Sequence, residues 1–476
     1  MSQNFNAEKL LATGKMGPLI ARYAIPGAVG LVFFSLQSIV DGIIVGNFIG
    51  PDALASVSLV MPAYTMLTAI ALIVGIGSQA QMSIGMGQGD YTKTKSALKT
   101  GMIFIVAFAS VFTVFINAFP GQVAGFLGSE GVLLQGSVDY IRGVMPFMIA
   151  NACFYFFDYV LKALGHPRFS MIVMISSVLL NAALSILFVT VFNMGTFGVG
   201  LATGLSMLTG GILSGSVAWK QLRNNKNLAS VKGSFNWRLL WRIFYNGSSE
   251  GVSEIAMGVT LFLFNITLME VAGKEGVAAF SVINYIIFIG TSILLGISDG
   301  TIPVVSFNYG AKLWGRIREA LKVVIRTNLL IGIVFLILLW TCGEFIISLF
   351  LDSSSQAVID MAVQGSRIMG FAFLLNGFNI FTASFFTAID NAKWSLLIAS
   401  LRGLIFIVIG INIFPAVLGI NGIWMTIPIA ELLTALIGVT LLRRIMKKNA
   451  SEREKMHSGT GYFFRKEYNE LYDKNN

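Results

Sequence analysis

The chain has 476 residues, 55% of them hydrophobic and 12% charged, with a net charge of +10 and a mean hydropathy of +0.77. Soluble domains carry about 25% charged residues, so this composition excludes an ordinary soluble protein and indicates an all-α integral membrane protein. No phosphate-cradling glycine loop occurs, and the few histidines and cysteines stand alone at His166, His457, Cys153 and Cys342. Metal-dependent, hydrolytic and ATP-driven chemistry is therefore disfavoured, and neither enzymatic activity nor a cofactor is expected.

Twelve apolar runs are long enough to cross a bilayer of about 30 Å. The first six cover 18–46, 53–85, 97–119, 137–163, 169–192 and 196–219. The second six cover 241–272, 276–308, 319–343, 360–388, 394–415 and 421–442. We therefore expect an N-lobe over 18–219 and a C-lobe over 241–442, joined by a polar linker at 220–240. A short segment, 1–17, precedes them, and a basic and polar tail, 443–476, follows.

Basic residues are concentrated in alternate connections between these runs. They are Lys9, Lys15, Lys93, Lys95, Lys99, Arg168, Lys220, Arg223, Lys226, Lys232, Arg238, Lys312, Arg316, Arg318, Lys393 and the tail from Arg443 onward. The opposite connections hold Asp52, Glu130, Asp139, Lys274, Glu275, Asp352 and Asp360. The positive-inside rule then predicts that both termini are cytoplasmic. This asymmetry explains the net charge without a nucleic-acid partner.

The two halves resemble each other in sequence. Residues 52–99 align without gaps on 275–322, so that Gly77 matches Gly300 and Gly87 matches Gly310. Further matches pair 151–170 with 376–395 and 197–206 with 421–430. Six spans per half is an even number, so a pseudo-two-fold axis along the membrane normal should relate the lobes. A substrate site between rocking lobes is typical of a secondary transporter, which we expect to function as a monomer within the lipid bilayer.

Asp41 interrupts the apolar run of the first span, in the stretch SIVDGIIVGNFIG. A buried carboxylate is costly unless it is paired, hydrated or protonated, and no cation lies within one helical turn of it. Gly42, Gly46 and Gly50 leave one side of this helix without side chains. This could allow tight helix packing or leave room for water and an ion. Pro26 can bend this helix. Asp41 is therefore a candidate cation-coupling residue of the N-lobe.

Charged residues inside other spans divide into pairs and unpaired acids. Asp158 and Lys162 are four residues apart, as in a structural ion pair within one helix. Arg142, Arg367 and Arg402 are also interpreted as structural. The seventh span, in contrast, carries two acids without a nearby cation.

Glu250 and Glu254 share one face of the seventh span, where two carboxylates cannot both ionise cheaply. A proton carrier or a Na⁺ site would use such a pair, although Glu250 could instead be hydrated at the cytoplasmic mouth. Asp299 and Glu431 could each either face a cleft between the lobes or serve helix packing.

The chain resembles the MATE (multidrug and toxic compound extrusion) family over residues ~15–445. The resemblance rests on PDALASVSLVMP, GIGSQAQMSIGMGQGD and its repeat GISDGTIPVVSFNYGAK, with LKALGHPR and GINGIWMTIPIAELL. Within the family it is most similar to the bacterial drug-exporting group typified by staphylococcal MepA. The resemblance implies a MATE/MOP-type fold of twelve helices in two lobes. It also implies export of cationic or amphipathic organic compounds in exchange for H⁺ or Na⁺.

Several positions match the family's functional residues. By resemblance, Asp41 is the first-helix acid implicated in cation coupling, and Asn181 is a possible partner from the fifth span. Ser185 stands where many relatives carry a second aspartate. Glu254 matches a seventh-helix glutamate implicated in ion binding, and Asn376 replaces the tenth-helix aspartate often paired with it. A Na⁺ ion, if used, is thus expected at Asp41 or Glu254.

Three other functions are weighed against the exporter. A lipid-linked precursor flippase of the same superfamily would need a cavity lined with Arg and Lys, and these are few in the spans. A major-facilitator sugar or peptide transporter would carry a charged loop between its second and third helices, where GMGQGDYTKTKSALK stands here. An intramembrane enzyme would need a nucleophile and base or a metal set. Deep acids without cations favour the exporter of organic cations.

Overall fold

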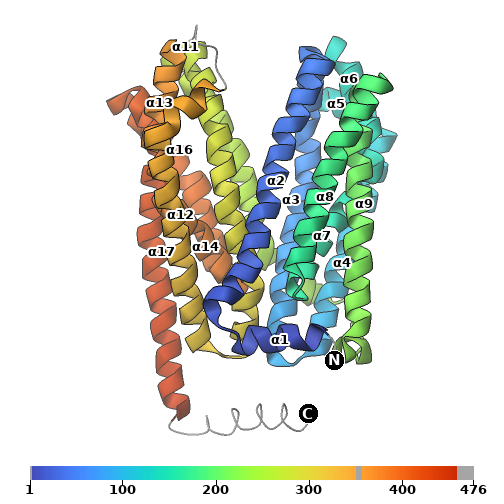
Figure 1. Ribbon diagram of the computed structural model, residues 1–476, viewed down its shortest axis with the longest axis vertical. Coiled ribbons are helices and arrows are strands. Elements are labelled where there is room, and N and C mark those ends of the chain that lie inside the picture. Colours follow the sequence, from blue (N-terminus) through green and yellow to red (C-terminus); the bar gives the residue numbers. More distant parts are fainter. Residues whose placement is uncertain (1–2, 350–355, 458–476) are drawn as a thin grey trace.

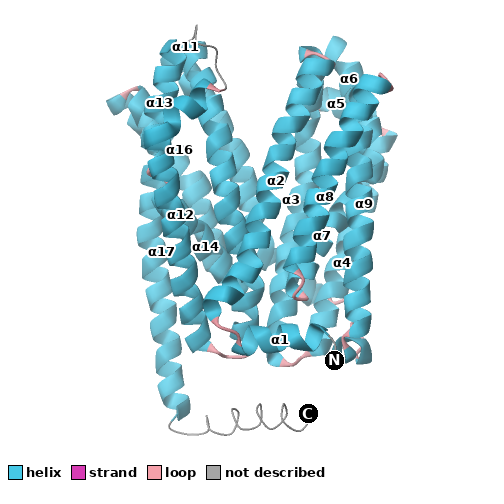
Figure 2. Ribbon diagram, viewed as in Figure 1, coloured by secondary structure: helices cyan, strands magenta, loops and turns pink. Residues whose placement is uncertain are grey.

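The computed structural model describes residues 3–349 and 356–457, so the predicted outer-loop residue Asp352 lies outside the described residues. The described chain is helical throughout, with short loops and no strand (Figure 2). An apolar chain in lipid must satisfy its backbone hydrogen bonds internally, and helices do this within each segment. The predicted all-α fold is therefore confirmed.

The first half begins with a short helix outside the spans. Its elements are α1 (Gln3–Thr13), α2 (Met16–Phe48), α3 (Pro51–Gln88), α4 (Tyr91–Ala118), α5 (Pro120–Phe126), α6 (Val132–Val144), η1 (Met145–Phe147), α7 (Met148–Ala163), α8 (Pro167–Ile186), η2 (Leu187–Val191), α9 (Gly195–Asn224) and α10 (Lys226–Ser230). Helices α6, η1 and α7 form one span, as do α8 and the π-helical turn η2. This half supplies the six predicted spans.

The second half contains one helix far too long for a single span. Its elements are α11 (Trp237–Gly310), α12 (Trp314–Ser348), α13 (Gln356–Gly370), α14 (Phe373–Ala388), α15 (Ala392–Ser400), η4 (Leu401–Ile405), α16 (Phe406–Leu418) and α17 (Ile420–His457). Gly273, with φ 62° and ψ −154°, breaks the 74-residue α11 into two helices. Helices α13 and α14 form one span bent by 50°. Counted this way, the described residues contain the twelve predicted spans.

The helices form two groups, α2 to α9 and α11 to α17. Figure 1 shows these lobes close together at the end of the molecule that carries α1, and diverging toward the other end. We call these ends the N-terminal face and the far face. The asymmetry shows that the lobes are joined at one end of the molecule and separate at the other.

Glycines make the contact between the lobes possible. A side chain on Gly87 of α3 would collide with the backbone of Phe307, and one on Gly310 of α11 would collide with the backbone of Ile84. The two contacts are equivalent under the internal repeat, because Ile84 aligns with Phe307 and Gly87 aligns with Gly310. The predicted pseudo-two-fold relation between the lobes therefore appears in their packing.

Further inter-lobe contacts lie in the helix halves nearest the N-terminal face. Backbone approaches join Gly27 to Gly296, Gly247 to Ile73, Gly77 to Ile243 and Gly300 to Tyr23. Ser35 and Ser292 share a hydrogen bond of 2.6 Å near the middle of their helices. Beyond it on α2, a side chain on Gly42 would meet nothing within 4 Å. Gly42 therefore leaves space next to Asp41 rather than making a tight contact.

Helix α1 lies along the N-terminal face and is fixed to the first lobe through Glu8. The hydroxyl of Tyr91 on α4 donates to Glu8 Oε2 at 2.8 Å. Burial raises the pKa of Glu8 above the ordinary carboxyl value, while hydrogen bonds from Tyr91 and Asn225 act in the opposite direction. Leu11, only 2% exposed, adds apolar packing.

The other end of α1 is bound by the second lobe. Arg316 Nη2, at the start of α12, donates to the carbonyls of Leu11 (3.1 Å) and Gly14 (2.8 Å). Asn308 Nδ2 of α11 also donates to the Leu11 carbonyl, at 3.2 Å. The last carbonyls of a helix lack intrahelical donors and carry partial negative charge, so a guanidinium suits them. Helix α1 thus bridges both lobes where they meet.

Replacing Arg316 with Ala should loosen α1 from the second lobe without unfolding the spans. Loss of two hydrogen bonds from a charged donor should speed amide exchange across residues 7–14 by about tenfold or more. Hydrogen–deuterium exchange read by mass spectrometry measures this. Arg318→Ala is the matched control, because its guanidinium contacts Met446 on α17 instead. Unchanged exchange in α1 of Arg316→Ala would contradict the bridging role.

Candidate functional site

Asp41 lies in the far-face half of α2, beyond the hydrogen bond between Ser35 and Ser292. Its side chain is half-buried, and Gln37, one turn earlier, faces the carboxylate. The charge of Asp41 acts on Tyr64 of α3 and Tyr140 of α6, which places both phenols near it. Asp41 Oδ1 is enclosed and has no hydrogen-bond partner. This carboxylate thus has no counter-ion among the described residues.

Other unpartnered oxygens surround the same part of the first lobe. Three side-chain oxygens are buried without a hydrogen-bond partner: Asn151 Oδ1 on α7, and Asn181 Oδ1 and Ser185 Oγ on α8. Buried polar atoms in proteins are normally hydrogen-bonded, so such a group points to a ligand, an ion or water. The expected partnership of Asn181 with Asp41 is not formed, since Asn181 Nδ2 donates to Thr203 Oγ1 at 3.2 Å. Tyr140 lies near Asp41 and beside Thr203, so it links Asp41 to the residue that binds the Asn181 amide.

Pro26 occupies a different place from Asp41. It lies inside the continuous helix α2, fifteen residues before Asp41 and about 22 Å away along the axis. It is buried next to Gly27, which touches Gly296 of the other lobe. Pro26 thus belongs to the contact between the lobes rather than to the surroundings of the carboxylate.

The predicted pair of Asp158 and Lys162 is confirmed. Lys162 Nζ lies 2.5 Å from Asp158 Oδ2, both residues are 5% exposed, and Ser170 donates to the other carboxylate oxygen. Lys162 also lies over the ring of Tyr159, 4.9 Å from its centroid. Its charge reaches Asp299 of the second lobe, so the pair stands at the boundary between the lobes.

Three acids of the second lobe gather opposite α7. Glu250 and Glu254 are half-buried on α11, and neither makes a hydrogen bond or ion pair with another described side chain. Asp299, 3% exposed, lies near Glu250 and leaves Oδ1 without a partner. Tyr155 and Tyr159 of α7 face this group from the first lobe. The acids therefore lie where the lobes meet, lined by tyrosines on the facing side.

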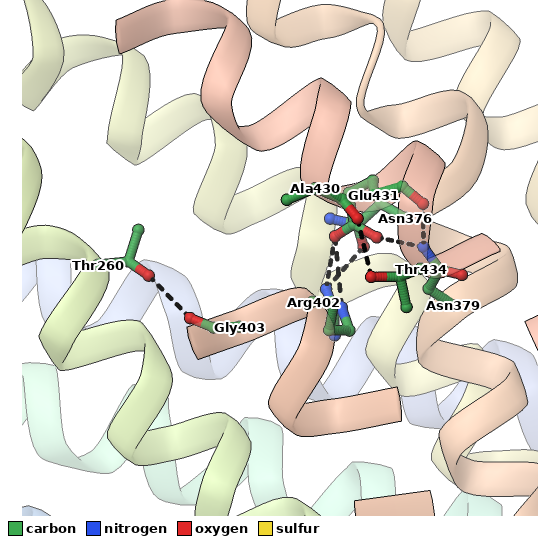
Figure 3. A network of polar contacts seen from close by, with 8 residues as sticks. All are labelled: Thr260, Asn376, Asn379, Arg402, Gly403, Ala430, Glu431 and Thr434. Atoms are coloured by element: carbon green, nitrogen blue, oxygen red, sulfur yellow. Dashed lines mark hydrogen bonds and ion pairs between the residues drawn. The ribbon is translucent and has the colours of Figure 1, made fainter. Parts of the chain in front are cut away.

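Glu431 is held inside the second lobe and is not a free cleft acid. Arg402 donates to Glu431 Oε1 through Nη2 (3.1 Å) and Nε (3.3 Å), and Asn379 Nδ2 donates to Oε2 at 2.6 Å (Figure 3). Asn376 Oδ1 accepts from Arg402 Nη2 at 3.4 Å and so does not join Glu254. Of the two alternatives for Glu431, helix packing is correct. The same ion pair gives Arg402 a partner within its lobe.

The described residues contain no group of three or more His, Cys, Asp or Glu side chains placed to hold a metal ion. Cys153 and Cys342 are free thiols, the first half-buried and the second exposed.

The family of the chain follows from its match to a family model. The MatE model matches the chain twice, over residues 26–187 and 251–412, once in each lobe. The chain belongs to the MatE family. The two matched segments also reproduce the internal repeat.

Curated relatives of this MatE-family chain carry a drug-export name. "Multidrug export protein MepA" of Staphylococcus aureus (strain N315) is 25% identical over 439 residues, covering 90% of this chain and 95% of the relative. The protein of the same name from Staphylococcus saprophyticus is 24% identical over 450 residues, covering 92% and 96%. These relatives span nearly the whole chain.

Solved structures share the fold. A "multidrug resistance MATE family transporter of the MOP superfamily" in an outward-facing conformation superposes with a TM-score of 0.86 at 21% identity, covering 94% of this chain and 99% of that one. "MATE in complex with MaL6" gives a TM-score of 0.87 at 21% identity, covering 95% and 100%. The predicted two-lobe fold is confirmed.

The sequence did not predict the tyrosines that lie around Asp41 and the second-lobe acids. Tyr155 and Tyr159 are four residues apart and interleave with Asp158 and Lys162. Read as one face of the fourth span of this MatE-family chain, that spacing would have indicated a polar face toward the other lobe. Tyr64 and Tyr140 lie on other helices than Asp41, so spacing along the sequence gives no such signal for them.

Proposed function

We propose that this chain is a secondary antiporter that exports cationic or amphipathic organic compounds in exchange for H⁺ or Na⁺. The observation that carries the proposal is a set of acids without counter-ions: Asp41 in the first lobe, and Glu250, Glu254 and Asp299 in the second. Such acids attract cations and must be neutralised in turn by substrate and by the coupling ion. The names of the MepA relatives support drugs as the substrate class.

The coupling ion and its place follow from the same side chains. In the first lobe, Asp41 with the free oxygens of Asn151 and Asn181 offers the ligand type that Na⁺ prefers. A proton on Asp41 would equally remove the cost of an enclosed, unpaired charge. The second lobe offers three carboxylates without a counter-ion, which suits protons or an organic cation as well as Na⁺. In this proposal Asp41 binds the coupling ion, and the acids of the second lobe attract the substrate. Both groups of unpaired acids then have a role.

We infer an arrangement in a bacterial inner membrane with the N-terminal face in the cytoplasm, because the basic connections lie on that face. The lobes are then joined on the cytoplasmic side and diverge toward the outside. A rocking motion of one lobe against the other would close the outer side and open the cytoplasmic side. A flippase for pyrophosphate-linked lipids is disfavoured. The buried cation Lys162 is already paired with Asp158, and Arg and Lys are few in the spans. One chain contains both lobes, so function as a monomer is expected.

Efflux of a fluorescent organic cation from proteoliposomes tests the proposal. Proton and sodium gradients are imposed separately, and transport should follow one of them. Transport that responds to neither gradient would refute antiport, while a response to one identifies the coupling ion.

Changing both second-lobe glutamates to glutamine should weaken transport strongly. Glu250→Gln/Glu254→Gln keeps shape but removes the charges that attract the substrate, so we expect transport at low substrate concentration to fall about tenfold or more. Glu270→Gln, an exposed glutamate on the same helix, is the matched control and should transport normally. Initial rates against substrate concentration measure the effect. Equal rates in the double variant and the control would remove these acids from the site.

A further inference from the structure

Arg402 has hydrogen-bonding capacity that the pair with Glu431 does not use. Its Nε and Nη2 point to Glu431 and Asn376, whereas Nη1 makes no hydrogen bond to a described residue and is not enclosed. The side chain keeps 16% of its surface exposed, against 4% for Glu431. The guanidinium is thus fixed at one edge and open at the other.

The backbone beside Arg402 packs against the helix that carries two of the second-lobe acids. Arg402 belongs to η4, and Thr260 of α11 donates to the carbonyl of Gly403 beside it at 3.3 Å (Figure 3). A side chain on Gly403 would touch Ala256 of the same helix. The α11 segment that faces η4 therefore directly follows Glu250 and Glu254. The charge of Arg402 also reaches Glu250, which agrees with a shared space.

Packing alone does not require a charged pair at this position. Extended along the chain, the internal repeat aligns Arg402 with Ser177, Glu431 with Met207 and Asn379 with Phe154. A side chain on Gly210 of α9 would touch Ser177 and Phe154, so α7, α8 and α9 meet there without any charge. The first lobe thus closes the same junction with a serine and apolar groups. The second lobe carries a cation that its fold could do without.

We propose that Arg402 recognises the carboxylate of zwitterionic substrates, whose cationic group binds the acids Glu250, Glu254 and Asp299. An open guanidinium edge binds carboxylates through charged hydrogen bonds, and fixing by Glu431 orients it in advance. A substrate with both charges would satisfy both signs of the site, whereas a simple cation uses the acids alone. This inference rests on the proposed export of organic cations and adds a subsite to it.

Two dyes that differ only at a carboxyl group test the subsite. Rhodamine B carries a free carboxylate and is a zwitterion, while its ethyl ester is a cation of nearly the same shape. Their binding to the purified full-length chain in lipid nanodiscs is measured by fluorescence polarisation. Arg402→Gln should weaken binding of rhodamine B about tenfold or more and leave the ester unchanged or tighter. A merely structural role would weaken both dyes together.

Two further variants protect the test against misfolding. Arg402→Gln leaves Glu431 buried without its cation, so Arg402→Gln/Glu431→Gln restores neutrality and should show the same loss for rhodamine B alone. Arg402→Lys keeps the charge and should retain part of the preference. Parallel changes for both dyes, or a wild-type chain that binds only the ester, would overturn the subsite. Efflux of the ester by wild-type protein tests the proposed function separately, and its absence would refute that function.

Discussion

Replacing Asp41 with Asn should abolish most coupled transport while leaving the fold intact. The change preserves shape but removes the one charge that the first lobe offers to an ion. Attraction between unit charges at 4 Å near a protein surface is worth about 4 kcal/mol before water competes, so we expect initial rates at least about a hundredfold lower. Efflux from proteoliposomes under the coupling gradient measures this. Asp52→Asn, an exposed aspartate at the start of α3, is the control and should behave as wild type.

Stability separates this role from a structural one. Asp41 Oδ1 is enclosed and unpartnered, so the charged side chain costs free energy in the folded protein. Asp41→Asn should therefore leave the thermal unfolding temperature unchanged or raise it, even as transport is lost. A structural carboxylate would give the opposite result, a lower unfolding temperature. Full gradient-driven transport by Asp41→Asn would exclude the first lobe as the coupling site.

Features that depend on hydropathy and local spacing could be predicted from the sequence. The spans follow from the length of apolar runs, because the bilayer sets that length. The bond between Asp158 and Lys162 follows from helix geometry, because side chains four residues apart meet. The repeat pairs Gly87 with Gly310, and these two glycines make equivalent contacts between the lobes.

Contacts between distant helices were not predictable in this way. Arg402 and Glu431 lie on different helices, and periodicity within either helix carries no information about the other. The same holds for Asn181, whose amide meets Thr203 on α9 rather than Asp41. The π-helical turn η4 adds to the difficulty, since it changes the helical phase along this span, and the sequence does not reveal such a turn. Polar pairing inside a helical lobe thus needs the packed structure.

Removing the carboxylate of Asp158 should have the largest effect on stability. Asp158→Asn leaves Lys162 charged and 5% exposed without its ion-pair partner. Breaking a buried pair from one side costs about 3–5 kcal/mol, because the remaining charge is uncompensated. Denaturant unfolding of the purified protein in micelles, followed by tryptophan fluorescence, measures the loss. A loss below about 1 kcal/mol would contradict burial of the pair.

The opposite lobe makes this prediction more specific. The charge of Asp299 lies within reach of Lys162 and is its remaining counter-charge in Asp158→Asn. Asp158→Asn/Asp299→Asn should therefore be less stable than the sum of the two single variants, since the lysine loses both acids. Asp158→Leu/Lys162→Met removes the charges together and should recover most of the stability, as apolar replacement of a buried pair often does. Strict additivity of the aspartate variants would show that Lys162 does not connect the two lobes.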